Sequence, residues 1–186
     1  VILPTHRVVS GVEGWSAAGF LKAAEQYFST LQFPFSTESE RREAAEKMRR
    51  TMAASASTTF GALFQNGNAF YCLTRRDEPA SEKLLADLTP AERSLDVTIL
   101  HRIVFAQCLR MDDEAIRKEK HLSYVRHFEE GIDGVASGSA QACFFLNPVK
   151  IEQVRDIAFA GRVLPQKSTD FYPKLLSGLV LYTLDH

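Results

Sequence analysis

The chain has 186 residues, of which 45% are hydrophobic and 24% charged, a globular composition that excludes an intrinsically disordered chain. Its 22 basic and 23 acidic residues give a formal net charge of -1 at pH 7, so the chain has no overall field that would attract nucleic acid or an anionic membrane. Because no segment approaches about 18 consecutive apolar residues, we expect no membrane-spanning helix.

The N-terminal part predicts a strand followed by a helix. The β-branched run Arg7–Val9 indicates a short strand that ends before Gly11. Apolar residues then recur at three- and four-residue steps between Trp15 and Leu31, the pattern of an amphipathic helix. Pro34 interrupts this pattern, and a proline there permits only an edge strand or a loop.

A second helix is predicted for residues 37–54. Thr37 is a favourable N-cap residue, and Glu40 three positions later completes a capping box. Ala45, Met48 and Met52 form the only apolar stripe of this segment, and the other faces carry charges of both signs. A stripe this narrow predicts a surface helix that buries only its two methionines and the neighbouring alanine.

The clearest local signal is a β-hairpin. Thr58–Gln65 and Asn68–Thr74 are rich in aromatic and β-branched residues, and Asn66-Gly67 between them favours a two-residue type I′ turn. This register pairs Phe60 with Leu73 and Ala62 with Tyr71. Because both faces of the hairpin are apolar, we expect it to belong to a larger sheet that is covered on both sides.

The segment from Arg75 to Glu92 is polar and contains Pro79 and Pro90, so it is the best candidate for a flexible stretch. A boundary inside the chain is therefore possible near residues 75–93. A helix capped by Ser94 or Asp96 is expected next, and it is apolar on most sides, which indicates burial. His101 lies within it and is interpreted as a hydrogen-bonded core histidine rather than as a base.

The last third alternates strands and helices. The predicted elements are a strand at Leu122–Val125, a helix at Phe128–Ala136, a strand at Ala142–Leu146, a helix at Lys150–Ala160 that ends at Gly161, and a strand at Leu179–Leu184. The sequence as a whole predicts an α+β fold, with a mixed sheet, a β-hairpin and a C-terminal β-α-β unit, and with helices packed around the sheet. We expect residues 1–186 to form a single domain.

The three cysteines, Cys72, Cys108 and Cys143, are odd in number and lie in apolar runs, which predicts buried, reduced thiols. Reduced thiols and the absence of a secretory leader at Val1 favour a cytoplasmic location. No metal site is predicted, because His121 and His127 have unsuitable spacing and lack a third ligand. No cofactor motif or basic patch suggests a cofactor or nucleic-acid partner.

Several segments together resemble the bacterial and archaeal family called domain of unknown function 1015. The most specific is Pro165-Gln166-Lys167-Ser168-Thr169, and the others are Leu3–Val9, Phe60–Leu73, Ser94–His101, Gln141–Val149 and Ser177–Val180. Members of this family are longer proteins, and their upstream half carries a motif similar to ParB-like domains, some of which use nucleotides as small-molecule kinases. The motif is absent here. The resemblance therefore implies that this chain is the C-terminal part, with its own N-terminal domain as a partner.

The segment that follows Gly161 contains the candidate ligand-binding residues. It is not a phosphate-binding P-loop, because Gly161 stands six residues before Lys167 and Gln166 replaces the second glycine. Ammonium and hydroxyl groups could still hold a small anionic ligand, and the candidates are Lys167, Ser168, Thr169, Tyr172 and Lys174. The alternative is a rigid turn between Pro165 and Pro173 whose hydroxyls satisfy the loop backbone.

No catalytic group is predicted, and whether the chain is an enzyme stays open. One hypothesis is a non-catalytic C-terminal module of a larger protein. The alternative is half of an active site that grips the phosphate of a nucleotide or a phosphorylated metabolite, in a kinase-like phosphoryl transfer completed by the N-terminal half. The two differ in whether the loop at residues 165–174 faces a cleft or packs on its own domain.

Overall fold

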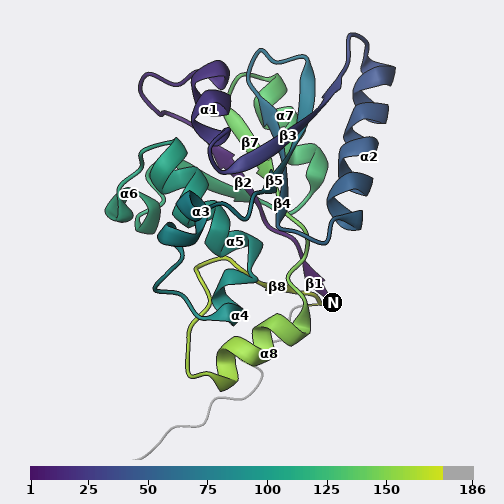
Figure 1. Cartoon of the computed structure of the whole chain (residues 1–186). Coiled ribbons are helices and arrows are strands. Elements are labelled where there is room, and N and C mark those ends of the chain that lie inside the picture. The colour runs from purple at the N-terminus through teal and green to yellow at the C-terminus, as the bar shows by residue number, and fades with distance from the viewer. Residues whose placement is uncertain (174–186) are drawn as a thin grey trace, which may run out of the picture.

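Figure 1 shows the fold of the chain in a computed structural model that describes residues 1–173. A six-stranded sheet forms its centre. In spatial order its strands are β3 (Phe28–Pro34), β5 (Ala69–Arg75), β4 (Thr59–Phe64), β7 (Ala142–Phe145), β2 (His6–Val9) and β6 (Leu122–Val125). The strand predicted at Leu179–Leu184 lies outside the described residues.

The prediction of an α+β fold is confirmed. Within the described residues every strand pairing is antiparallel, which differs from the mixed sheet that we expected. The reason lies in strand order: β6 and β7 are joined by helix α7 (Phe128–Ala136) and run parallel, but β2 lies between them and pairs antiparallel with both. In this half of the sheet, β7, β2 and β6, neighbouring strands are thus not consecutive in the chain.

Helices cover both faces of the sheet (Figure 1). Helix α2 (Glu38–Ala54) and α7 pack on one face, and α1 (Ala17–Ala24), α5 (Asp96–Ile99) and the π-helix η1 (Leu100–Cys108) cover the other. The central strand β7 supplies side chains to both layers, because Phe144 belongs to the larger core and Phe145 to the smaller one. The other helices are α3 (Pro79–Leu84), α4 (Pro90–Arg93), α6 (Asp113–Arg117) and α8 (Ile151–Phe159).

A second, two-stranded sheet brings the N-terminus of the chain to the candidate loop. Strand β1 (Ile2–Leu3) pairs antiparallel with β8 (Asp170–Phe171). The backbone N–H of Tyr172 donates to the carbonyl of Val1 at 2.8 Å, and the amino group of Val1 donates to the carbonyl of Tyr172 at 3.0 Å. These bonds hold β8 and Tyr172 against the first three residues of the chain, which lead into β2.

The predicted helix between Trp15 and Leu31 is wrong in its second half. Helix α1 ends at Ala24, and Phe28 begins β3, which pairs with β5 along its whole length. Leu31 is 51% exposed on this strand. β3 pairs with β5 at seven positions, and the backbone hydrogen bonds of this pairing stabilise a strand. They outweigh the helical spacing of the apolar residues, which is only a weak preference for a helix. Pro34 ends the edge strand β3, as predicted.

The hairpin is confirmed in its strands and its register, which pairs Phe60 with Leu73 and Ala62 with Tyr71. The two-residue type I′ turn is wrong. Asn66 has the positive φ of 57°, but Gly67 does not, and the strands are separated by residues 65–68. The backbone of Gln65 donates to Gln141 at 2.9 Å, and the carbonyl of Asn68 accepts from Phe35 at 2.8 Å, so both are drawn toward other segments.

Helix α2 matches its prediction closely. The hydroxyl of Thr37 accepts from the backbone of Glu40 at 3.2 Å, and the Glu40 carboxylate accepts from the backbone of Thr37 at 3.1 Å. Met48 and Met52 are buried against the sheet, at 0% and 4% exposure. The narrow apolar stripe therefore correctly predicted which face of α2 packs on the sheet.

The segment at 75–93, where a boundary was considered, contains α3 and α4. The buried helix that follows is split into α5 and η1, and its N-cap is Leu95, so that Asp96 becomes the first helical residue. All three cysteines are free: Cys72 and Cys143 are buried and Cys108 is half-buried. Burial raises the pKa of Cys72 to about 11 and that of Cys108 to about 12, so these thiols stay protonated.

Two glycines of α7 give a matched test of this packing. A Cβ at Gly131 would lie 2.6 Å from Sγ of Cys143 and 3.0 Å from the Phe145 ring, whereas a Cβ at Gly134 would meet nothing closer than 3.8 Å. We expect Gly131→Ala to destabilise the chain by about 1–3 kcal/mol through overpacking. Gly134→Ala should stabilise it by about 0.5–1 kcal/mol through helix propensity. Urea unfolding measures both, and equal effects of the two substitutions would contradict the packing of α7 on β7.

Candidate functional site

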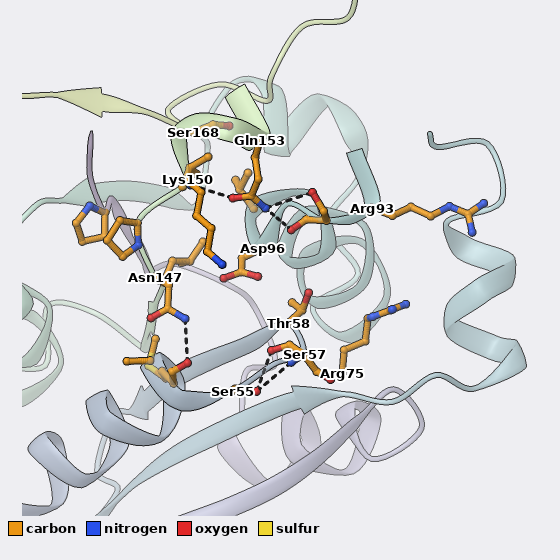
Figure 2. A pocket seen from close by; sticks show the side chains of 18 of the residues that line it. Ser55, Ser57, Thr58, Arg75, Arg93, Asp96, Asn147, Lys150, Gln153 and Ser168 are labelled. Atoms are coloured by element: carbon orange, nitrogen blue, oxygen red, sulfur yellow. Dashed lines mark hydrogen bonds between the residues drawn. The ribbon is translucent and has the colours of Figure 1, made fainter. Parts of the chain in front are cut away.

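A cavity of about 680 Å³ lies at the edge of the sheet where β5 and β7 end and where β2 and β4 begin (Figure 2). Its walls come from segments that are far apart in the chain, namely residues 4–7, 52–58, 75–77, 93–97, 146–153 and Ser168. Antiparallel pairing places these strand ends side by side, and α4 and α8 contribute Arg93 and Gln153 to the wall. Both helices lie below the sheet in Figure 1. This is the volume of an ordinary small-molecule site, for which roughly 300–1,000 Å³ is typical.

Arg7 is the most unusual residue of this wall. It lies on β2 and is only 1% exposed. Its guanidinium donates to the carbonyl of Thr5 and, at 2.9 Å, to the carbonyl of Lys167, and its Cζ lies 5.4 Å from the centre of the Tyr124 ring. The Nε atom is buried without a hydrogen-bond partner, and within residues 1–173 no carboxylate forms an ion pair with this side chain. Burial lowers the pKa of Arg7 to about 10, which still leaves it charged at neutral pH.

Asp96 and Lys150 extend into the same part of the cavity from opposite walls (Figure 2). Asp96 is held at the start of α5, and burial raises the pKa of its carboxyl to about 6. A hydrogen bond from Thr58 and the positive charge of Lys150 oppose this rise without cancelling it. The carboxyl therefore exchanges its proton close to neutral pH, which is a property of groups that accept a proton in catalysis.

Hydrogen bonds orient the start of α8 at this wall. The backbone N–H of Lys150 donates to the side chain of Gln153 at 2.9 Å, and the amide of Gln153 donates to the carbonyl of Ser94 at 2.7 Å. On the other side of the cavity, the amide of Asn147 donates to the carbonyl of Met52 at 3.2 Å. These bonds join the loop after β7 and the start of α8 to the segment before α5 and to the end of α2. The segments that line the cavity are therefore hydrogen-bonded to one another.

Two further arginines lie at the rim, where acidic partners already balance them. Arg75 pairs with Asp77 at 2.8 Å and with Glu82 at 2.9 Å, and Arg93 pairs with Glu82 at 3.1 Å. In Figure 2 both side chains extend away from the space between Asp96 and Lys150. Lys150 faces the carboxyl of Asp96, so the positive charge of the wall that has no carboxylate partner within residues 1–173 is that of Arg7.

The predicted site residues do not converge on one point. Ser168 is buried, lines the cavity, and donates its hydroxyl to the carbonyl of Pro165. Lys167 is exposed with φ of 54°, Thr169 is half-buried, and Tyr172 is 61% exposed. Lys174 lies outside the described residues. The loop thus packs on its own domain, as expected of a rigid turn. It also places Ser168 at the wall of the cavity, as expected of a ligand-binding loop.

Sequence reasoning missed Arg7, Asp96 and Lys150. A single arginine in a short β-branched strand was the available signal for Arg7, because a buried strand position rarely carries a charge without a ligand or partner. Asp96 was considered only as a helix cap. Lys150 had no local signal, since its position depends on how α8 lies against α5.

No group of three or more metal-ligating side chains is present among residues 1–173, and no helix in this range is long and apolar enough to cross a membrane.

The fold and the cavity define an α+β domain with a polar site at one edge of its sheet. Residues 1–98 match the model of a family described as a protein of unknown function (DUF1015), and the chain belongs to this family, as the resemblance indicated. A comparison with curated proteins gives no match. Among solved structures, the chain is similar to a free serine kinase in complex with AMP, with a TM-score of 0.48 and 15% identity over 91% of this chain and 52% of that one. The chain therefore spans about half the length of that protein.

The raised pKa of Asp96, a half-buried residue, predicts a pH dependence of stability. Its pKa is raised from 3.8 to about 6 in the folded chain, so the folded state binds this proton more tightly than the unfolded state. The resulting stabilisation of the folded state is complete at a pH below 3.8, the pKa of the carboxyl in the unfolded chain. It is lost as the pH rises through 6, the pKa in the folded chain. Because asparagine stays neutral, we expect Asp96→Asn to raise the Tm above pH 7 by roughly 3 °C and to have little effect near pH 4.

Thermal unfolding followed by circular dichroism between pH 4 and 8 measures this difference. Asp133→Asn, at an exposed position of α7, is the control and should leave the Tm unchanged. A lower Tm of Asp96→Asn at every pH would show that the ionised carboxylate stabilises the fold.

Proposed function

We propose that this chain is a binding module for a small molecule that carries a phosphate or a similar anionic group, which would lie in the cavity beside Arg7. The observation that carries the proposal is the buried guanidinium of Arg7, which lines the cavity with no ion-pair partner in residues 1–173 and with a free Nε. Removing the partner of a buried charge costs about 3–5 kcal/mol, and Arg7 has only two backbone carbonyls and the Tyr124 ring to offset its burial, so an anionic ligand would stabilise it further.

Other groups at the cavity suit the same ligand. Lys150 also lines the cavity, and an anion within reach of both Lys150 and Arg7 would receive charge-assisted hydrogen bonds from each. Ser57 supplies a hydroxyl group at the wall, whereas the hydroxyls of Thr58 and Ser168 already donate to Asp96 and to the carbonyl of Pro165. The volume of about 680 Å³ accommodates a nucleotide or a phosphorylated metabolite rather than a bare ion alone.

The loop residues take part in this proposal in two ways. The carbonyl of Lys167 accepts from Arg7 and so orients the guanidinium, and Ser168 adds a hydroxyl at the wall. We propose that Lys167, Thr169, Tyr172 and Lys174 contribute when a ligand is bound. Lys167→Ala should then weaken binding by roughly 1.5–3 kcal/mol and leave the Tm nearly unchanged.

Arg7→Met gives the sharpest test, because methionine fills much of the arginine volume without its charge. Isothermal titration calorimetry with pyrophosphate and with AMP should show saturable binding to the chain and none with adenosine. In Arg7→Met the affinity should fall at least tenfold, about 1.4 kcal/mol or more, while the Tm stays equal or rises because a buried charge is removed.

The matched control is Arg42→Met on α2, whose side chain is 81% exposed, and it should bind as the unchanged chain does. An Arg7→Met variant that unfolds earlier and binds pyrophosphate with unchanged affinity would assign a purely structural role to Arg7. The proposal would then be withdrawn.

Asp96 favours a second candidate, half of an active site for kinase-like phosphoryl transfer. A carboxyl with a pKa near 6, placed beside the cations that would hold a phosphate, could accept the proton of an attacking hydroxyl group. In the longest natural polypeptide that contains this chain, Asp96→Asn should lower the rate of ADP formation from ATP by about 10²-fold or more, with AMP binding retained. An unchanged rate would contradict this candidate and leave the binding proposal standing.

A further inference from the structure

A second cavity, of about 560 Å³, lies on the face of the sheet that α2 and α7 cover, beside the first cavity. The two cavities have several wall residues in common, among them Pro4, Asn147 and Pro148. Successive residues of β2 point to opposite faces of the sheet, so Arg7 lines the first cavity and its neighbour His6 lines the second. The remaining walls come from the end of α2 and the start of α7.

His6 has one ring nitrogen that is available to a ligand in the second cavity. The residue is 4% exposed, and its Nδ1 accepts from the backbone N–H of Leu146 at 3.3 Å. Nδ1 is therefore unprotonated, and burial lowers the pKa of His6 to about 4, so the neutral ring carries its hydrogen on Nε2. Nε2 has no hydrogen-bond partner in residues 1–173 and is not closed off from solvent. Because His6 lines this cavity, the Nε2–H group is a free donor at its wall.

Helix α7 begins at the same cavity. His127 is its N-cap residue, but no side chain caps this end of the helix, and Phe128 and Glu129 of the first turn line the wall. The first N–H groups of a helix have no partner within the helix and lie at the positive end of its dipole, which favours an anionic group. The start of α7 thus adds backbone donors to the donor of His6.

The ring of Phe128 brings a third kind of donor to this place. The guanidinium of Arg49 on α2 lies 5.4 Å from the centre of the ring, and the imidazole of His6 lies 5.9 Å from it in an edge-on arrangement. The charge of Arg49 also contributes to the lowered pKa of His6, which agrees with this proximity. Donors from β2, α2 and α7 therefore surround the first residue of α7.

The charged side chains of the wall nearly balance one another. Three arginines and two glutamates line the cavity. Glu46 pairs with Arg50 at 3.1 Å and with Arg49 at 3.5 Å, and Arg126 pairs with Asp170 at 2.6 Å. A wall with this small excess of positive charge suits a group with one negative charge better than a doubly charged phosphate.

We propose that the second cavity binds a small carboxylic acid with an apolar body, whose carboxylate lies at the start of α7 and accepts from His6, Arg49 and the first N–H groups of the helix. A carboxylate has about four lone-pair sites, so it can accept from several donors at once. Phe145 and Pro148 supply apolar surface for the rest of the molecule. This site goes beyond the proposed function, because it does not involve Arg7 and can be filled whether or not the first cavity holds an anion.

Benzoate is a suitable probe, and benzamide, which has the same shape without the charge, is its control. In NMR titrations of the chain, the backbone amide signals of the first turn of α7 should shift saturably with benzoate. Benzamide should bind about tenfold more weakly, because hydrogen bonds to a charged acceptor are stronger than those to a neutral one.

Arg49→Met separates binding from structure. The arginine side chain is 58% exposed and its ion pair with Glu46 contributes little to stability, so the Tm should change little while the affinity for benzoate falls about threefold or more. Arg42→Met, at an 81% exposed position of the same helix, is the control and should bind benzoate as the unchanged chain does.

Substitutions of His6 test the ring donor. His6→Phe keeps an aromatic ring without the N–H group and should weaken benzoate binding about tenfold. His6→Gln, whose side-chain amide donates from near the position of Nε2, should retain most of the affinity.

The proposal is overturned if the amide signals of α7 do not shift saturably, if benzamide binds as tightly as benzoate, or if Arg49→Met and His6→Phe both bind benzoate with unchanged affinity. Titrations with both probes distinguish this site from the first cavity. Arg49→Met should still bind pyrophosphate, and Arg7→Met should still bind benzoate.

Discussion

The arrangement of the first cavity depends on the buried guanidinium of Arg7. It is the group through which β2, the loop before β8 and the ring of Tyr124 on β6 meet, although β2 is more than a hundred residues from each of the other two in the chain. Its bonds to two backbone carbonyls use two guanidinium nitrogens and leave the third free. Carbonyl dipoles offset only part of the positive potential of a guanidinium, so much of it remains to attract an anionic ligand. A carboxylate partner would cancel that potential.

The titratable groups around Arg7 maintain this field. Burial and the charge of Arg7 together lower the pKa of His6 to about 4, with Arg49 as a further cause, and His6 accepts a hydrogen bond from the backbone of Leu146 at 3.3 Å. Burial and the charge of Arg7 also lower the pKa of His101 to about 4, so both rings are neutral at physiological pH. Neither ring repels the charge of Arg7, and neither carries a charge that attracts an anion away from it. The first cavity is then a place where positive charge stays in excess close to Asp96, whose own proton is easily exchanged.

Much of the fold was predictable because its signals are local. The capping box at Thr37 and Glu40, the apolar stripe of Met48 and Met52, and the register of the hairpin are each read from one short, continuous stretch of the chain. The predictions were wrong where contacts with residues distant in the chain determine the local structure. Phe28 joined an edge strand because β5 lies beside it, and the hairpin turn lengthened because Gln65 and Asn68 bond to other segments.

The candidate site shows the same division. The sequence by itself determined an α+β fold, membership of a family of unknown function, and a distinctive segment at residues 165–169 as a place of interest. Only the tertiary structure decided that this segment packs against Arg7 and places Ser168 at the wall of the first cavity. Helical and strand periodicities come from interactions between near neighbours in the chain. The position of Arg7 relative to Lys167, Asp96 and Tyr124 depends instead on strand order and on helix packing, which no short stretch of sequence encodes.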